Sequence, residues 1–178
     1  ALKDIAVELA KAGQTQQALQ IFDDALNVAG FIYDNDDKAR ALKDIAVELA
    51  KAGQTQQALQ IFDDALNVAG FISKDSSKAS ALSSIASELA KAGQTQKALQ
   101  IFDDALNVAG SISDDSDKAW ALRDIAVELA KAGQFDKAVN VAGSITRDYS
   151  KAYALRDIAL ELAKAGQFDK AFDVAGSI

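Results

Sequence analysis

Apolar residues recur along this chain three or four residues apart, the spacing that places side chains on one face of a helix. One such run follows Ala41 and consists of Leu42, Ile45, Ala46, Leu49 and Ala50. Gly53 comes shortly after it, and glycine is the residue that most readily takes the left-handed conformation at a helix end. The pattern therefore predicts a helix, which we call helix A.

A second apolar run follows the glycine and has a broader face. Its central positions are Ala58, Phe62, Ala65, Ala69 and Ile72, and the positions that widen it are Leu59, Ile61, Leu66 and Val68. A helix that packs on one side only needs a narrower apolar stripe. The breadth predicts a second helix, helix B, that contacts its own helix A and the helix A of the following unit.

The pair of runs is repeated throughout the chain, and Ala1 to Ile32 recurs letter for letter as Ala41 to Ile72. Repetition at a fixed period is typical of solenoids, in which each unit buries its apolar face against its neighbours. We therefore predict an all-α solenoid of stacked antiparallel helix A and helix B hairpins. Because no linker interrupts the copies, we expect one domain over residues 1–178, with repeats at 1–40, 41–80, 81–120, 121–153 and 154–178.

The early repeats are 40 residues long and the fourth is 33, and the difference is close to two helical turns. We expect helix B to be shorter by that amount in the last two repeats, with its buried face unchanged. The glycine near the end of each helix B could end the helix, but we favour a place inside the last turn for Gly30, Gly70, Gly110 and Gly143. The residues expected to cap each following helix A are Asn35, Asp75, Asp115 and Asp148.

Composition narrows the chemistry that this chain can perform. It has no cysteine and no histidine, which removes disulfides, thiol chemistry, and the commonest metal ligand and general base. A net charge of −7 disfavours nucleic acid and anionic membranes as partners, and no stretch is apolar enough to cross a membrane. We expect a soluble, cytoplasmic protein with no metal and no cofactor.

Charged clusters have structural explanations. The acidic stretches that begin at Asp34 and Asp114 lack the glycine and distal glutamate of a calcium loop, so helix capping and solvation explain them. Lys3 directly precedes Asp4, and because adjacent side chains on a helix diverge, we expect no helical ion pair between these two residues.

These residues resemble the tetratricopeptide repeat. Ala18, Phe22 and Ala25 reproduce the spacing of its helix B. In the same frame, Ala6 stands at its small position in helix A, and its large helix A positions hold Leu2, Ile5 and Leu9. The sequence departs from the family pattern in its aliphatic helix A and its longer period. The resemblance implies a right-handed superhelix whose concave surface, lined mainly by helix A, holds a peptide or protein segment, and it implies no enzyme activity.

A candidate binding face lies on helix A, at positions where the repeats differ from one another and that share one side of the helix. Ser87 stands where other repeats have valine or leucine, and because an unpaired hydroxyl is costly in a packed core, we expect this face to be accessible. Trp120 and Tyr153 are the expected anchors, with Arg123 and Arg156 beside them to accept a carboxylate. Drift on an exposed face explains the variation equally simply. The candidate residues are Arg40, Lys43, Asp44, Val47, Ser80, Ser83, Ser84, Ser87, Trp120, Arg123, Asp124, Val127, Tyr153, Arg156, Asp157 and Leu160.

Two other interpretations remain. The first two repeats share 34 of 40 positions, so the chain can be a structural or engineered array that forms homo-oligomers end to end through apolar ends such as Phe172 and Val174. An enzyme would need a convergent set of acidic, lysine or tyrosine residues, and no non-repeating motif provides one. The chain starts in mid-pattern at Ala1, so we also expect a fragment or a trimmed form of a longer protein.

Overall fold

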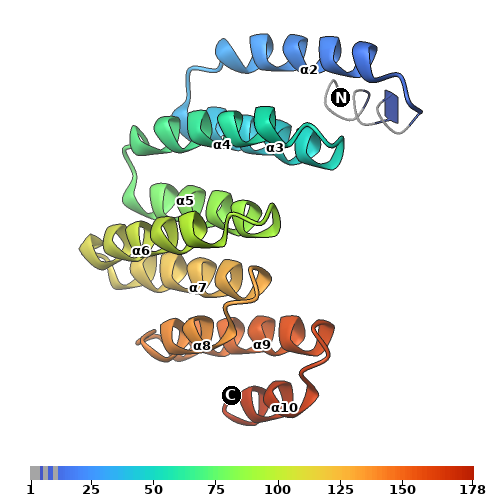
Figure 1. Ribbon diagram of the computed structural model, residues 1–178. Coiled ribbons are helices and arrows are strands. Elements are labelled where there is room, and N and C mark those ends of the chain that lie inside the picture. Colours follow the sequence, from blue (N-terminus) through green and yellow to red (C-terminus); the bar gives the residue numbers. More distant parts are fainter. Residues whose placement is uncertain (1–4, 6–7, 10–11) are drawn as a thin grey trace. The chain divides into compact units, whose positions relative to one another are not determined.

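The computed structural model describes residues 5, 8–9 and 12–178, and every regular element in them is an α-helix (Figure 1). The helices group into two compact units, Ala1–Ile72 and Ser73–Ile178. The first unit contains α2 (Thr15–Gly30), α3 (Asn35–Lys51) and α4 (Thr55–Gly70). The second contains α5 (Asp75–Lys91), α6 (Thr95–Ser111), α7 (Asp115–Lys131), α8 (Phe135–Gly143), α9 (Asp148–Lys164) and α10 (Phe168–Gly176).

α3, α5, α7 and α9 are helices A, and each packs against its own helix B and against another helix of the same unit. In the second unit, α5 contacts α6 and α7, α7 contacts α8 and α9, and α9 contacts α8 and α10. In the first unit, α3 contacts both α2 and α4. This is the packing of an all-α solenoid, as the sequence predicts. One continuous domain with the five repeat boundaries given above stays a prediction.

The turn from helix A to helix B is built on a left-handed glycine. Gly53 has a φ of 79°, which few other residues adopt without strain. The Gln54 amide donates to the Leu49 carbonyl at 2.9 Å, and the Gly53 amide donates to Ala50 at 3.0 Å. These two bonds satisfy carbonyls that the helix end would leave without partners. The predicted terminator is therefore confirmed.

Helix B ends differently, and its glycine stays within the helix. Gly30, Gly70 and Gly143 are the last residues of their helices, and Gly110 lies one residue inside α6. None of the four has a positive φ. The preference for a place in the last turn is confirmed. Helix B has 16 residues in α2 and α4, 17 in α6, and 9 in α8 and α10, so the predicted shortening is confirmed as well.

The predicted helix A caps are wrong by one residue. α3, α5, α7 and α9 begin at the predicted residues themselves, and the cap position is the residue before each. Asp34 accepts a hydrogen bond from the Asp37 amide at 2.9 Å, and Asp114 accepts from the Ser116 and Asp117 amides at 2.9 and 2.8 Å. The acidic stretches thus cap helices, as expected. Lys74 and Arg147 hold the same position in α5 and α9 without a side-chain cap.

Two of the residues misplaced as caps link neighbouring repeats instead. The Asn35 side-chain amide donates to the Phe71 carbonyl at 3.1 Å within the first unit. In the second unit, the Ser111 hydroxyl donates to Asp75 at 3.5 Å. A side chain near the start of a helix can bond to the free amides of its own helix or to groups at the end of another helix. Asn35 and Asp75, as the first residues of their helices, do the second.

One aromatic ring and several small side chains form the core of each long hairpin. Phe62 and Phe102 are 1% and 0% exposed, and the alanines on the same helix faces are equally buried. Leu49 and Leu89, on the helices A of the same two hairpins, are 2% and 0% exposed. Small residues let the backbones approach while the rings fill the remaining space, which gives close packing. Ala50, predicted on the buried face, is only half-buried.

Some residues used in the sequence argument lie outside the described residues, namely Leu2, Lys3, Asp4 and Ala6. No helix in the described part of the chain is both long enough and apolar enough to cross a bilayer.

Candidate functional site

The helix A face of the second unit carries two matching aromatic and arginine pairs. The Arg123 guanidinium lies 4.0 Å from the centre of the Trp120 ring on α7. On α9, the Arg156 guanidinium lies 4.5 Å from the centre of the Tyr153 ring. Residues three apart on a helix are neighbours, so each arginine can fold back over the ring one turn earlier. Such cation–π contacts hold both partners in a fixed arrangement.

Each arginine is also bound to the aspartate that follows it. Arg123 donates to Asp124 from Nε at 3.3 Å and from Nη2 at 2.9 Å. Arg156 makes the same two bonds to Asp157, at 2.9 and 2.7 Å, and the bonds raise the pKa of Arg156 above its ordinary value. Adjacent charges pair on these two helices because a long arginine side chain curves back to its neighbour.

Tyr149 is a further member of this face that the sequence analysis missed. Its ring centre lies 4.5 Å from that of Tyr153, and its hydroxyl donates to the Tyr153 hydroxyl at 3.0 Å. That hydrogen bond raises the pKa of the Tyr149 phenol, while the charges of Arg156 and Arg123 act in the opposite direction. The signal was present, because Tyr149 lies four residues before Tyr153 and hence on the same helix face.

We call this group the aromatic–arginine surface. It joins two neighbouring helices A, since α7 contacts α9 directly. Trp120 is 48% exposed and Tyr149 is 68% exposed, whereas Tyr153 is half-buried. Its members are Trp120, Arg123 and Asp124 of α7 and Tyr149, Tyr153, Arg156 and Asp157 of α9.

Ser83 and Ser87 contradict the expected accessibility of the candidate face, because both are 0% exposed. They lie on α5, which packs against α7, and small side chains permit that contact. Ser83 donates to the Ser80 carbonyl at 3.0 Å, whereas the Ser87 hydroxyl has no hydrogen-bond partner. The prediction failed because it took a serine as a sign of solvent, while here a serine lies under a neighbouring helix. Ser80 and Ser84 are half-buried.

The remaining candidates divide between the two units. In the first unit, exposed Arg40 forms ion pairs with Asp36 at 3.4 Å and Asp37 at 3.7 Å, and Lys43 pairs with Asp44 at 3.4 Å. Val47 and Val127 are half-buried, and Leu160 is 54% exposed. The structure thus brings together only the α7 and α9 candidates around aromatic rings.

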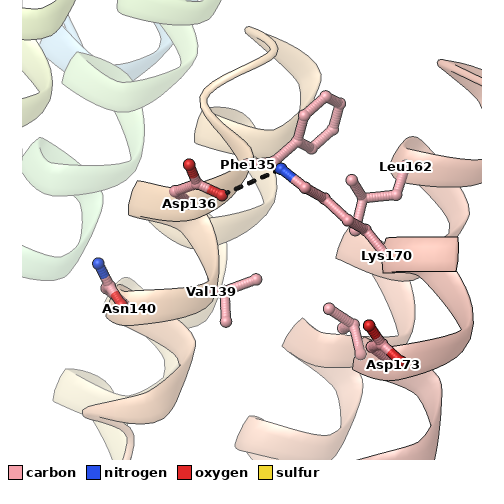
Figure 2. Close-up of a pocket in the computed structure, with 8 residues that line it drawn as sticks. Phe135, Asp136, Val139, Asn140, Leu162, Lys170 and Asp173 are labelled. Carbon is pink, nitrogen blue, oxygen red and sulfur yellow. Dashed lines mark hydrogen bonds and ion pairs between the residues drawn. The ribbon is translucent and has the colours of Figure 1, made fainter. Parts of the chain in front are cut away.

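Two grooves that the sequence analysis did not predict lie between consecutive helices B. One groove of about 380 Å³ separates α8 from α10, with Leu162 of α9 as part of its lining (Figure 2). Another of about 230 Å³ separates α2 from α4, and its lining includes Leu49 of α3. Leu49 and Leu162 occupy the same place in the repeat, so the two grooves are equivalent. No group of acidic side chains suited to a metal ion occurs in the described residues.

Comparison with known proteins agrees with this architecture. The sequence profile of the tetratricopeptide repeat matches residues 1–69 and 77–151. The crystal structure of Ton1535 from Thermococcus onnurineus NA1 has a TM-score of 0.64 and 25% sequence identity, covering 99% of this chain and 53% of its own. The present chain therefore spans about half, 53%, of that relative.

Two crystal structures of a Podosopora anserina putative kinesin light chain with nearly identical TPR-like repeats, one of them a variant, are also similar. Their TM-scores are 0.55 and 0.53, at 14% and 15% identity. The matches cover 99% and 97% of this chain and 90% and 89% of the other. At this level of sequence identity, the structural similarity shows a shared fold and nothing more. A search among curated proteins finds no match.

Proposed function

Because the chain belongs to the tetratricopeptide repeat family, whose members generally mediate protein–protein interactions, we propose that it binds a peptide or protein segment on its aromatic–arginine surface. The observation that carries the proposal is the exposed Trp120 ring with Arg123 stacked on it. Tryptophan, tyrosine and arginine are the residues that most often dominate binding energy at protein interfaces. The family is typically non-enzymatic, and we propose no catalytic role.

The contacts within the surface favour an apolar or aromatic anchor on the partner. Arg123 and Arg156 are both neutralised by an adjacent aspartate, so an incoming carboxylate would compete with Asp124 and Asp157. The exposed parts of the Trp120 and Tyr149 rings have no such competitor, and they gain most from contact with another apolar side chain. The stacked arginines are already held in place, which lowers the ordering cost of binding.

The test is peptide selection on the full chain, followed by affinity measurements on the best peptide. Trp120→Ala and Tyr153→Ala are each expected to weaken binding at least about tenfold, the effect typical of a central aromatic anchor. Tyr33→Ala is the matched control, since Tyr33 is a fully exposed tyrosine in the other unit. Equal affinities for all three variants and the parent chain would contradict the proposal.

A second candidate function is self-association through α10, and one observation favours it. No residue of α10 is buried, and Phe172 is 77% exposed, whereas its counterpart helix α8 buries Ala138, Val141 and Ala142. A second copy of the chain carries helices A of the kind that cover α8. We propose this as the alternative function, a homo-oligomeric array.

A further inference from the structure

Lysine side chains connect consecutive helices B in the second unit. Lys137 of α8 reaches Asp103 of α6, with Nζ to Oδ1 at 2.6 Å. Lys170 of α10 reaches Asp136 of α8 in the same way, at 3.5 Å. Both pairs are separated by 34 residues, so the same contact recurs from one repeat to the next.

The groove between α8 and α10 contains one of these lysines. Figure 2 shows the Lys170 side chain crossing from α10 toward Asp136, with Leu162 beside its aliphatic part. Val139 and Val174 add apolar surface to the same lining. Lysine suits such a groove, because its methylene chain covers apolar surface while its ammonium group remains close to water and to a carboxylate.

The equivalent groove in the first unit has the carboxylate but no lysine. Asp23 of α2 lines the groove between α2 and α4, and the residue 34 positions later is Gln57 of α4. Gln57 follows Gln54 at the spacing by which Lys170 follows Gln167. A neutral amide replaces the ammonium group, and among the described residues Asp23 takes part in no hydrogen bond and no ion pair.

The rest of this groove matches the methylene part of a lysine side chain. Its lining includes Leu26, Leu49 and Ile61, with the buried Phe22 ring behind them. Its volume of about 230 Å³ exceeds that of one long side chain, and Gln57 of α4 makes no hydrogen bond to Asp23 among the described residues.

We propose that the groove between α2 and α4 binds a lysine side chain from a partner peptide. The ammonium group pairs with Asp23, and the methylenes lie against Leu26, Leu49 and Ile61, as Lys170 lies in the α8–α10 groove. The chain's net charge of −7 favours the approach of a basic segment. This site is on helix B, so it is separate from the aromatic–arginine surface on helix A.

The experiment is a methyl-resolved NMR titration of the full chain with the peptide acetyl-Leu-Ala-Lys-Ala-Leu-amide. A second peptide with norleucine in place of lysine keeps the methylenes and removes the charge. We expect the lysine peptide to shift the methyl signals of Leu26 and Ile61, and to bind about 1.4- to fivefold more tightly than the norleucine peptide, the range for a solvent-exposed ion pair. Ile61→Val identifies the Ile61 signal among the near-identical repeats.

Two variants test the geometry directly. Gln57→Lys restores the lysine of the other repeats, and its side chain is expected to occupy the groove and lower the peptide affinity about tenfold or more. Gln56→Lys adds the same charge to an exposed neighbour outside the lining and should lower affinity much less. Asp23→Asn should abolish the difference between the two peptides, whereas Asp104→Asn, with the same change of charge in the other unit, should retain it.

The proposal is overturned if neither peptide shifts the groove signals, if lysine and norleucine peptides bind equally, or if Gln57→Lys and Gln56→Lys behave alike. Trp120→Ala must leave this titration unchanged, which separates the result from a failure of binding on helix A. Circular dichroism before each titration confirms that every variant is folded.

Discussion

The hydroxyl of Ser87 makes no interaction that stabilises the fold. The Ser87 side chain on α5 is fully buried, and its hydroxyl has no hydrogen-bond partner among the residues that the structure describes. Ser83, four residues earlier and equally buried, satisfies its hydroxyl on the carbonyl of its own helix. A buried polar group without a partner loses its hydrogen bond to water and gains nothing in return.

We therefore predict that Ser87→Ala raises the free energy of unfolding by about 1 kcal/mol, the low end of the cost of a buried unsatisfied hydroxyl. Ser83→Ala serves as the control and should give no gain, because it removes a satisfied hydroxyl from the same helix. Urea denaturation followed by circular dichroism measures both. A loss of stability in Ser87→Ala would show that the hydroxyl has an unseen partner.

Ser83 and Ser87 also show which property of single residues the sequence did not predict, namely their burial. The repeat pattern predicted one helix face, and Trp120 and Leu160 on it are exposed whereas Ser83 and Ser87 are buried. It could not predict that Ser83 and Ser87 are buried, because burial depends on how closely neighbouring helices approach. Tyr149 was missed for a simpler reason, since the comparison of the repeats began at the position of Tyr153, one helical turn later.

At the scale of a helix, the two glycines that flank each helix B have opposite roles. Gly93 precedes α6 with a φ of 83°, and Gly110 lies in its last turn without a positive φ. An added methyl group meets no atom within 4 Å at either position. The two glycines therefore differ in backbone conformation and not in the space available for a side chain.

We predict opposite signs for the same substitution at these sites. Gly93→Ala should lower the free energy of unfolding by about 1 kcal/mol, because alanine is strained at a positive φ. Gly110→Ala should raise it by about 0.5 kcal/mol, since alanine favours the helix. Thermal unfolding of both variants measures the difference. A change of the same sign in the free energy of unfolding for both variants would contradict the positive φ of Gly93 or the helical conformation of Gly110.

Helix existence, type and relative length were all predictable from sequence, because the apolar period and the loss of a heptad determine them directly. The starts of helix A were not. Asn35 and Asp75 are good capping residues, yet the chain begins the helix at these residues and uses them to contact the next repeat. Local propensity could not anticipate a contact between residues 36 positions apart.

At the scale of the whole molecule, identical sequences acquire different environments. α8 and α10 share the pattern Phe-Asp-Lys-Ala, followed by Val-Ala-Gly-Ser-Ile after two further residues. Val141 and Ile145 are 8% and 3% exposed, because α9 covers α8. The corresponding Ile178 is 60% exposed, and Val174 is half-buried. Burial in a solenoid is supplied by the neighbour, so sequence identity between repeats does not predict it.

The uncovered face of α10 predicts how the molecule behaves with increasing concentration. Ala171, Val174 and Ala175 of α10 match the three residues that are buried on α8, and helices A of a second copy offer the same complement. We expect the molar mass in sedimentation equilibrium to rise above the 18.7 kDa of a monomer as concentration increases. A contact of this kind joins different surfaces of two copies, so it can extend beyond a dimer.

The face can be tested without changing the charge of the chain. Phe172→Gln combined with Val174→Gln should keep the mass at 18.7 kDa over the same concentration range. Phe31→Gln is the control, because Phe31 is 81% exposed but lies at the end of α2, and this variant should associate as the parent does. If the parent stays monomeric, α10 does not drive association, and peptide binding on helix A becomes the function to pursue. If the double variant still associates, the contact does not depend on Phe172 and Val174.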